Sequence, residues 1–259
     1  MLRRRSVLKL LMNWRSTRIF SRSRMPDEVA RMIVEAGARA PNYSYLQAYS
    51  IIQIKDESLR ERVIELCEGQ DELIKNAAAL FIICADLNRV RKLLDLLGHN
   101  HVLRSNKHPI ESIFTVFDSG LLVAFMILAA EVLGYGSVIL DYPLVYPREF
   151  AELLQLPRGV TPLILLCVGE KGESPPLRPR FPLKLIFFQD RYREPEEEDL
   201  ENHLRDLEGS MRRENYVKKY VGLDMDYLEY LRLKTGLDEN LKKLYDSVEK
   251  YLRENLLKF

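Results

Sequence analysis

Residues 120–140 read GLLVAFMILAAEVLGYGSVIL, a long apolar stretch that fixes the centre of the fold. The stretch approaches the length of a membrane-spanning helix, but Glu131 interrupts it and Gly134-Tyr135-Gly136 breaks it. Because a carboxylate is unfavourable in lipid, we interpret the segment up to Leu133 as a helix buried on all sides. A turn then leads into a strand, and no membrane association is predicted.

Apolar periodicities on both sides of this helix predict alternating strands and helices. Pro26, with Asp27 and Glu28 after it, marks the start of a helix that ends before Pro41. Further strands are expected at 50–54, 80–85, 137–140 and 162–169, and further helices at 58–66 and 147–154. The pattern indicates an α+β core of about four strands and five helices.

The last third of the chain has a different composition. The proline-rich segment SPPLRPRFPLK (174–184) breaks regular structure, and the acidic run EPEEEDL (194–200) follows it. Beyond this run the sequence is helical in period and lacks a strand pattern. We therefore expect a core over residues 1–185 and a helical C-terminal extension over residues 186–259.

The balance of charges and the cysteine content limit the possible binding partners and the cellular compartment of the protein. Lys+Arg (39) and Asp+Glu (38) almost cancel, so no global field attracts nucleic acid. Cys67, Cys84 and Cys167 are far apart and odd in number, which indicates reduced, mostly buried thiols and a cytoplasmic protein. The N-terminal MLRRRSVLKLLMNW has too short an apolar run for a signal peptide.

Two basic clusters are candidates for holding an anion. Trp14-Arg15-Ser16-Thr17-Arg18 offers two guanidinium groups and two hydroxyls, and guanidinium groups match phosphate oxygens well. In Arg178-Pro179-Arg180 the proline stiffens the backbone and aims the charges. A solvated basic turn is the alternative for the first cluster taken alone, whereas the two clusters together indicate one anion between them.

Residue-based catalysis and metal chemistry find little support in the sequence. It lacks GxGxxG, Walker, GxSxG, CxxC and HExxH motifs. His99, His101 and His108 match no standard metal-ligand spacing, so we interpret them as part of a polar loop and predict no metal site. An enzyme without an evident nucleophile or base commonly relies on a cofactor.

Five ordered motifs resemble those of the nitroreductase superfamily. They are WRSTRIF, RAPNYSYLQAYSIIQIKD, GQDELIKNAAALFIICADLNR, AAEVLGYGSVIL and LRPRFPLKLI. The chain is most similar to the subgroup of oxygen-insensitive nitroreductases and NADPH-flavin oxidoreductases, which also carries a helical extension. The resemblance implies a three-layer α+β fold with a central, mostly antiparallel sheet flanked by helices, and a homodimer with FMN at its interface.

The resemblance also assigns roles to individual residues. Arg15, Ser16, Arg178 and Arg180 correspond to FMN phosphate and ribityl contacts, and Arg18 to a cation near the pyrimidine side of the ring. The other implied FMN contacts are Asn42, Tyr43 and Ser44, by which the partner subunit touches FMN, together with Gln47, Gln70, Leu140 and Asp141. Those implied for the acceptor or nicotinamide are Tyr45, Arg212 and Arg213.

Three positions depart from the family pattern. Trp14 replaces a basic residue, Asp141-Tyr142 replaces a pair of glycines near the ring, and Glu208 replaces an arginine that contacts the NADPH 2′-phosphate. A carboxylate near the flavin disfavours its reduced form. Because Glu208 stands where that arginine is expected, strict NADPH preference is not predicted. Asp141 either faces the flavin or caps the next segment in solvent.

The sequence thus predicts an FMN-dependent NAD(P)H oxidoreductase that passes two electrons, in a ping-pong mechanism, to a small acceptor such as a nitroaromatic, quinone or free flavin. The flavin carries the chemistry, and no catalytic side chain is predicted. Two alternatives stay open: a specialised superfamily member, dehalogenase-like or flavin-modifying, and a non-catalytic FMN-binding protein whose extension serves a protein partner.

Overall fold

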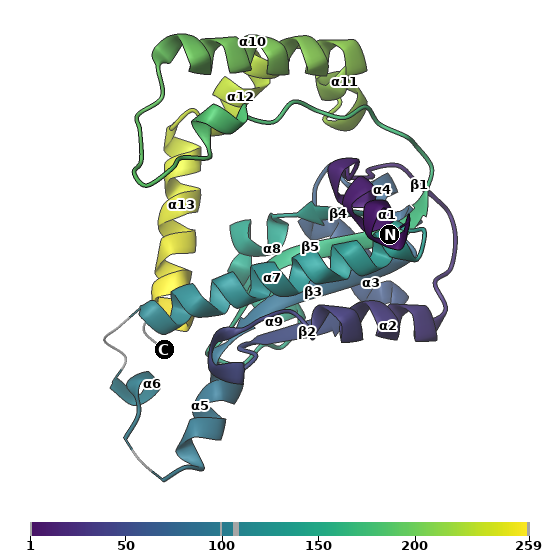
Figure 1. Cartoon of the computed structure of the whole chain (residues 1–259). Helices are drawn as coiled ribbons and strands as arrows, with labels where there is room; N and C mark the ends of the chain where they lie inside the picture. Colours follow the sequence, from purple (N-terminus) through teal and green to yellow (C-terminus); the bar gives the residue numbers. More distant parts are fainter. Residues whose placement is uncertain (1, 99, 106–108, 258–259) are drawn as a thin grey trace. The chain divides into compact units, whose positions relative to one another are not determined.

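A computed structural model describes residues 2–98, 100–105 and 109–257, and the chain divides into two compact units (Figure 1). The sheet-bearing unit comprises Ser16–Glu173 and Glu239–Phe259, and the appended unit comprises Met1–Arg15 and Ser174–Asp238. This division differs from the expected boundary between residues 185 and 186, because the last helix of the chain belongs with the sheet.

The sheet is antiparallel at every pairing of its described strands, as expected. Its strands are β1 (Phe20–Ser21), β2 (Tyr49–Gln53), β3 (Ala79–Asp86), β4 (Gly136–Leu140) and β5 (Val160–Lys171). The order is β1-β5-β3-β2, with β4 also paired to β5. Every residue of β3 is buried, which follows from its continuous apolar run ALFIICAD.

Helices cover both faces of this sheet. The helices of the sheet-bearing unit are α2 (Asp27–Gly37), α3 (Glu57–Leu66), α4 (Asp71–Asn76), α5 (Leu87–Asp95), α6 (Val102–Ser105), α7 (Ile110–Val132), α8 (Tyr142–Val145), α9 (Pro147–Leu153) and α13 (Glu239–Leu252). A short turn η1 (Tyr43–Tyr45) precedes β2, and a last turn η3 (Arg253–Leu257) follows α13.

Alternate residues of β3 supply a hydrophobic core on each face. On one face Leu80 and Ile82 pack with residues of α3, α4 and α9. On the other face Phe81 and Ile83 pack with residues of α2 and α7 (Figure 1). This three-layer arrangement confirms the expected fold class. Cys67, Cys84 and Cys167 are all free and buried.

The long helix α7 is buried on one side only within the chain. It begins at Ile110, ten residues before the predicted start at Gly120, after Pro109 at its N-cap. By length and composition α7 meets the criteria for a membrane span, but Leu122, Met126 and Ala130 are buried against the sheet and α2. Its exposed apolar side chains are Ile113, Val116, Phe117, Phe125 and Val132. The predicted burial on all sides is therefore not met within one chain.

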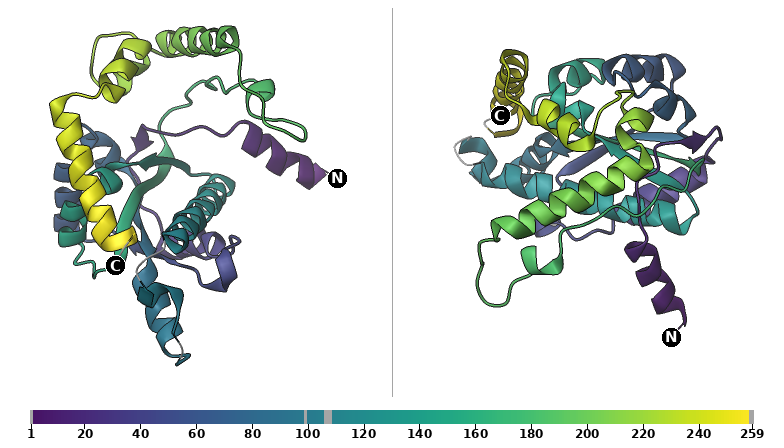
Figure 2. Two further views of the ribbon diagram at one scale, coloured as in Figure 1. Left: turned by 90° about the vertical axis from the view of Figure 1, so that its left-hand side faces the viewer. Right: turned by 90° about the horizontal axis from the view of Figure 1, so that it is seen from above.

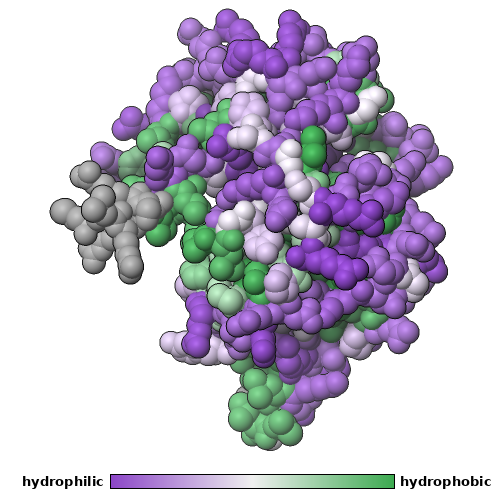
Figure 3. Space-filling model, turned by 90° about the vertical axis from the view of Figure 1, so that its right-hand side faces the viewer, coloured by the Kyte–Doolittle hydropathy of each residue, from purple (hydrophilic) through white to green (hydrophobic). Residues whose placement is uncertain are grey.

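The C-terminal helix α13 completes the sheet-bearing unit (Figure 2). Leu252 and Leu256 pack with Ala85, Leu87 and Leu163 in a third hydrophobic cluster. Beyond this cluster, α5, the turn after it and α6 carry the exposed side chains of Leu93, Leu96, Leu97 and Val102. These residues form the apolar tip visible at the bottom of Figure 3.

The appended unit is helical, as predicted for the extension. Its elements are α1 (Leu2–Met12), η2 (Leu183–Leu185), α10 (Glu197–Glu214), α11 (Tyr216–Tyr220) and α12 (Tyr227–Thr235). The N-terminal α1 has no counterpart among the predicted elements. Ring contacts hold the unit: Phe181 stacks on His203, and Tyr216 contacts Tyr220 and Tyr227.

Candidate flavin site

The segment after Ser16 is fixed by its own backbone. The Thr17 N–H donates to the Ser137 carbonyl at 3.0 Å, at the start of β4. The N–H groups of Arg18 and Ile19 donate to one oxygen of Glu173, at 2.8 and 3.1 Å. These bonds hold the segment that carries two of the expected flavin contacts, Ser16 and Arg18.

Gly136 allows the backbone at Thr17 to lie close to the start of β4. A Cβ atom at residue 136 would lie 2.3 Å from the Thr17 hydroxyl oxygen, inside van der Waals contact. A larger residue would therefore displace the Thr17 segment from β4. The glycine after Tyr135, which in the sequence marks a break before the strand, thus has a second role in placing the expected flavin contacts.

Arg15, from the first basic cluster, lies in the appended unit together with the second cluster. Arg15 Nη1 donates to the carbonyl of Pro175 at 2.8 Å. Pro175 is buried and lies three residues before Arg178, on the proline-rich segment that also carries Arg180. Within the appended unit, Arg15 is therefore bound to the proline-rich segment that carries the second basic cluster.

Within this pair of clusters, Arg178 is bound to a carboxylate. Its Nε and Nη2 donate to the two oxygens of Glu214 at 2.9 and 2.7 Å, and only 13% of the Arg178 side chain and 3% of Glu214 are exposed. The guanidinium also lies 4.7 and 5.7 Å from the ring centres of Tyr216 and Tyr220. Burial lowers the pKa of Arg178, but the bonds to Glu214 outweigh burial and raise this pKa above its ordinary value.

Arg180 is arranged differently. Its side chain is exposed, and it makes no hydrogen bond or ion pair with another residue in the part of the chain that the structure describes. Its neighbour Arg178, two residues before it, is bound to Glu214. Of the two arginines in the second basic cluster, Arg180 is therefore the one whose charge is not neutralised by an acid of the described residues.

Residues 42–44, which are predicted to contact the flavin of the other subunit, are hydrogen-bonded to α7. The Tyr43 N–H donates to both carboxylate oxygens of Asp118, at 3.0 and 3.1 Å. The ring of Tyr43 stacks on Phe114, with centroids 4.1 Å apart and planes 6° apart. Asp118 is only 2% exposed, and burial raises its pKa while the bond from Tyr43 acts in the opposite direction.

Backbone strain marks the residues that follow Tyr43. Ser44, Tyr45 and Gln47 have φ values of 51°, 57° and 48°, in the left-handed region that non-glycine residues rarely adopt. Asn42 Oδ1 accepts from the Gln47 N–H at 3.2 Å and closes the loop. Tyr45 is 93% exposed. Strain of this kind persists where the surroundings hold the backbone, and it is common at functional loops.

Gln70 and Asp141 lie around a common neighbour, Tyr142. The Tyr142 hydroxyl donates to the Glu68 carbonyl at 2.7 Å, and the Gln70 side chain hydrogen-bonds the phenol. Burial, and then the charge of Asp141, raise the pKa of Cys67 to about 12. The phenol of Tyr142 thus covers the turn between α3 and α4.

Asp141 itself is exposed and begins α8. Its carbonyl accepts from the N–H groups of Leu144 and Val145 at 2.9 and 3.1 Å. The preceding Leu140 is buried and ends β4, where it pairs with Leu165. The Asp141 side chain makes no capping hydrogen bond to α8, so its orientation toward or away from the flavin stays a prediction.

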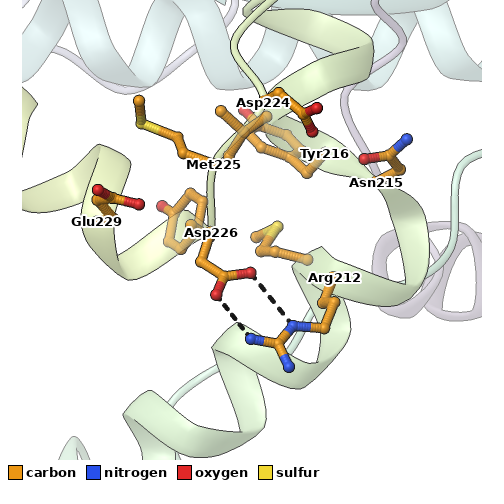
Figure 4. A pocket seen from close by; sticks show the side chains of 10 residues that line it. Arg212, Asn215, Tyr216, Asp224, Met225, Asp226 and Glu229 are labelled. Atoms are coloured by element: carbon orange, nitrogen blue, oxygen red, sulfur yellow. Dashed lines mark hydrogen bonds and ion pairs between the residues drawn. The ribbon is translucent and has the colours of Figure 1, made fainter.

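In the extension, Arg212 is paired with an acid. Its Nε and Nη2 donate to the carboxylate of Asp226 at 3.2 and 2.7 Å, beside a cavity of about 360 Å³ (Figure 4). Asp224 and Glu229 also line this cavity. Arg213 is exposed and lies over Gly209. The surroundings of Arg212 are therefore acidic, which opposes the approach of a phosphate.

An apolar groove lies beside α7. Its cavity, of about 320 Å³, is lined by residues of β3, β4, β5, α7 and α8, among them Val116, Gly120, Ile139 and Ile164. The absence of a side chain at Gly120 leaves the helix surface open at this point. The groove continues the exposed apolar side of α7.

The histidine loop is only partly within the described residues. His99 and His108 lie outside them, while His101 is buried and hydrogen-bonds Asp95 at 2.8 Å. Among the described residues, no group of three or more His, Cys, Asp or Glu side chains is placed to hold a metal.

The sequence reasoning missed three residues that hold the predicted contacts. Asp118 and Phe114 fix the 42–44 segment, and Glu214 binds Arg178. Asp118 gave no clear signal, because it lies before the predicted start of the helix at Gly120 and is one of three carboxylates in α7. Glu214 carried none, because acidic residues are frequent throughout the extension.

Comparison with known proteins identifies the family. The nitroreductase family profile matches residues 11–170. An oxygen-insensitive NADPH nitroreductase of Salmonella typhimurium is 32% identical over 188 residues, which cover 72% of this chain and 74% of the relative. An FMN reductase [NAD(P)H] of Bacillus subtilis is 30% identical over 206 residues, covering 79% and 81%. The structure of NfrA2 from B. megaterium superposes with a TM-score of 0.81 at 24% identity, covering 98% of both chains. The chain therefore belongs to the nitroreductase family.

Proposed function

We propose that this protein is an FMN-dependent NAD(P)H oxidoreductase that reduces a small acceptor. The observation that carries the proposal is the hydrogen bond from Arg15 to the Pro175 carbonyl, which holds Arg15 on the proline-rich segment that also carries the exposed Arg180. Relatives named as a nitroreductase and as an FMN reductase support the same reading. FMN, when bound, accepts hydride from a reduced nicotinamide and passes electrons to the acceptor.

The residues present fit a flavin phosphate and a polar ring edge. Arg15 and Arg180, both of the appended unit, would supply guanidinium donors that suit a phosphate, and the family resemblance adds the Ser16 hydroxyl. Arg178 supports them as an anchor, because its own donors are bound to Glu214. The remaining polar contacts come from Arg18, Asn42, Ser44, Gln47 and Gln70.

Dimer formation belongs to the proposal. The exposed apolar side of α7 and the groove beside it form a continuous apolar surface, which a second copy of the chain would cover. The same helix holds the 42–44 segment through Asp118. Burial of α7 near the twofold axis would therefore present this segment to the flavin of the other subunit. The free thiols accord with a reducing, cytoplasmic setting.

The acidic surroundings of Arg212 bear on the electron donor. The 2′-phosphate of NADPH near Arg212 would compete with Asp226 for the guanidinium. It would also be repelled by Glu208, which lies 3.7 Å from the guanidinium. We therefore infer that NADH serves at least as well as NADPH. Asp226→Asn is expected to lower KM for NADPH and to leave KM for NADH unchanged.

Two measurements test the function. The purified protein is expected to show the visible absorption of oxidised flavin, and anaerobic mixing with NADH or NADPH is expected to bleach it. Bound flavin that is not bleached by either nicotinamide would favour the non-catalytic FMN-binding alternative. Sedimentation of a stable, FMN-loaded monomer would overturn the dimer.

A further inference from the structure

A basic groove lies where β1 leads into α2, within the sheet-bearing unit. Its cavity has a volume of about 700 Å³ and is lined by the ends of β2 and α4 and the start of α3. Five basic side chains line it, against the acidic Asp27 and Glu57: these are Arg22, Arg24, Lys55, Arg60 and Lys75. None of the residues predicted to contact the flavin, nicotinamide or acceptor lies in this lining.

Two of these cations have no protein partner. Arg22 and Arg24 make neither a hydrogen bond nor an ion pair with other residues in the described ranges. Lys55, by contrast, is neutralised by Asp27 at 2.8 Å. Lys75 lies 3.9 Å from Glu72 in an exposed pair, and such pairs contribute little. The groove therefore keeps an excess of positive charge.

Arg60 differs from the other cations because its position is fixed. Its Nη1 donates to the backbone carbonyls of Ile74 and Ala77, both at 3.0 Å. These bonds connect α3 to the end of α4 and hold the guanidinium at the wall of the cavity. A fixed guanidinium loses little entropy when its remaining N–H groups bind an anion.

Ser23 provides a second observation that points to a ligand. Its hydroxyl oxygen is buried and has no hydrogen-bond partner, although it lies between Arg22 and Arg24 in the lining. Buried polar atoms in proteins are almost always hydrogen-bonded, so an unsatisfied hydroxyl in a cationic cavity indicates a missing acceptor. Met25, Ile54, Ala77 and Ala78 add an apolar part to the lining.

We propose that this groove binds a small phosphorylated anion, independently of the flavin. Arginine pairs and a hydroxyl donor match phosphate oxygens, and the cavity volume lies in the range of small-molecule sites. A nucleic acid fits less well, because the chain has a net charge of only +1 and the basic side chains are confined to one cavity.

Inorganic pyrophosphate is the probe for this site. Calorimetric titration uses the full chain saturated with FMN, so that any flavin phosphate clamp is already filled. Saturable binding is expected for the wild type. Arg22→Ala/Arg24→Ala removes two exposed charges and is expected to weaken pyrophosphate binding by about ten-fold or more. Ser23→Ala is expected to weaken it by about three-fold without changing the net charge.

Lys242→Ala/Lys243→Ala is the matched control. It removes two charges from exposed positions of α13 that do not line the groove. Pyrophosphate affinity is expected to remain within about two-fold of the wild type, because nonspecific attraction to net charge is weak. Equal weakening in both double variants, or no saturable binding to the wild type, would overturn the proposal. Tighter binding of a short single-stranded DNA than of pyrophosphate would overturn the small-molecule assignment.

Discussion

The two compact units hold their charged side chains in different ways. In the sheet-bearing unit, the buried carboxylate of Asp118 is bound by a backbone N–H. In the appended unit, Arg178 and Arg212 are each bound by a carboxylate, from Glu214 and Asp226. In the sheet-bearing unit the Asp118 carboxylate thus fixes the backbone at Tyr43. In the appended unit, any anion that approaches Arg178 or Arg212 competes with the carboxylate already bound there.

The units also differ in what stabilises them. Phe81, Ile82 and Ile83 are fully buried in the sheet, and each contributes about 1.5–3 kcal/mol through burial. The appended unit buries Met211 and Val217 but relies on ring contacts and ion pairs. Substitution of a single charged residue is therefore expected to be more damaging in the appended unit.

The largest effect is expected from Arg178→Met. Removing the arginine leaves Glu214 buried without its partner, which costs about 3–5 kcal/mol. Hydrogen exchange across residues 197–235 is expected to increase, with little change in β3. The double variant Arg178→Met/Glu214→Met is expected to restore protection, because an apolar pair replaces the buried ion pair. Failure of this rescue would show that the ion pair is not the anchor.

Glu214→Gln separates two roles for Arg178. If Arg178 is an anchor, this variant loosens the proline-rich segment and weakens FMN binding. If Arg178 contacts the flavin phosphate directly, loss of the competing carboxylate strengthens FMN binding. We expect weaker binding, measured by fluorescence titration of apo-protein. Riboflavin, which lacks the phosphate, serves as the control and is expected to bind equally well to wild type and variant.

Arg180→Ala is expected to have the next largest effect. It removes a charge-assisted phosphate contact, with a loss of about 1.5–3 kcal/mol in FMN binding and no loss for riboflavin. Arg212→Ala is the comparison, since Asp226 already neutralises that guanidinium. Equal FMN affinities in the two variants would remove Arg180 from the site.

Substitutions of Asp118 test whether its hydrogen bond to Tyr43 holds the loop of the sheet-bearing unit. Asp118→Ala leaves the Tyr43 N–H without an acceptor, at a cost of about 1–3 kcal/mol, and is expected to increase proteolysis near Tyr45. Asp118→Asn keeps an acceptor oxygen and is expected to preserve the loop. The two variants together show whether the hydrogen bond or the charge matters.

The pH dependence of Asp118 follows from the direction of its pKa. Burial raises this pKa in the folded state, so the folded protein binds the proton more tightly than the unfolded chain. The contribution to stability is fully present below the ordinary pKa and is lost as pH rises through the raised value. Asp118→Asn should therefore gain stability relative to wild type as pH rises from acidic to neutral. A constant difference in urea unfolding across this range would contradict the assignment.

Asp141→Asn is expected to have the smallest effect. Asp141 is exposed, so solvent and salt screen its charge. Potentiometric titration is expected to show a slight rise in the flavin midpoint potential, because a negative charge that opposes reduction has been removed. A large rise, with a wider range of bulky acceptors, would place the Asp141 carboxylate against the flavin instead.

Much of the fold was predictable because burial imposes a period on the sequence. The runs at 80–85 and 162–169 predict β3 and β5, and the spacing after Pro26 predicts α2. The start of α7 was not predictable, since Glu111 and Asp118 interrupt its apolar pattern. The helix α1 was missed because its basic start obscures a helical period.

The candidate site was less predictable than the fold. Motif order identified which residues to examine, but not their partners. Whether Arg178 faces a phosphate or Glu214 depends on a contact between residues 36 positions apart. Similarly, a single sequence does not reveal that the Asp118 carboxylate reaches back 75 positions to Tyr43.

Because α13 belongs to the sheet-bearing unit, it determines which shortened forms of the protein can keep their core. The extension is an insertion between β5 and α13, so it is not a detachable tail. A stop codon after residue 185 would delete Leu252 and Leu256 along with the extension and open the cluster around Leu163. An internal deletion of residues 174–238, closed by a flexible linker, would retain that cluster. A minimal protein without the extension therefore requires that residue 173 be linked to residue 239, because truncation at the C-terminus alone would also remove α13.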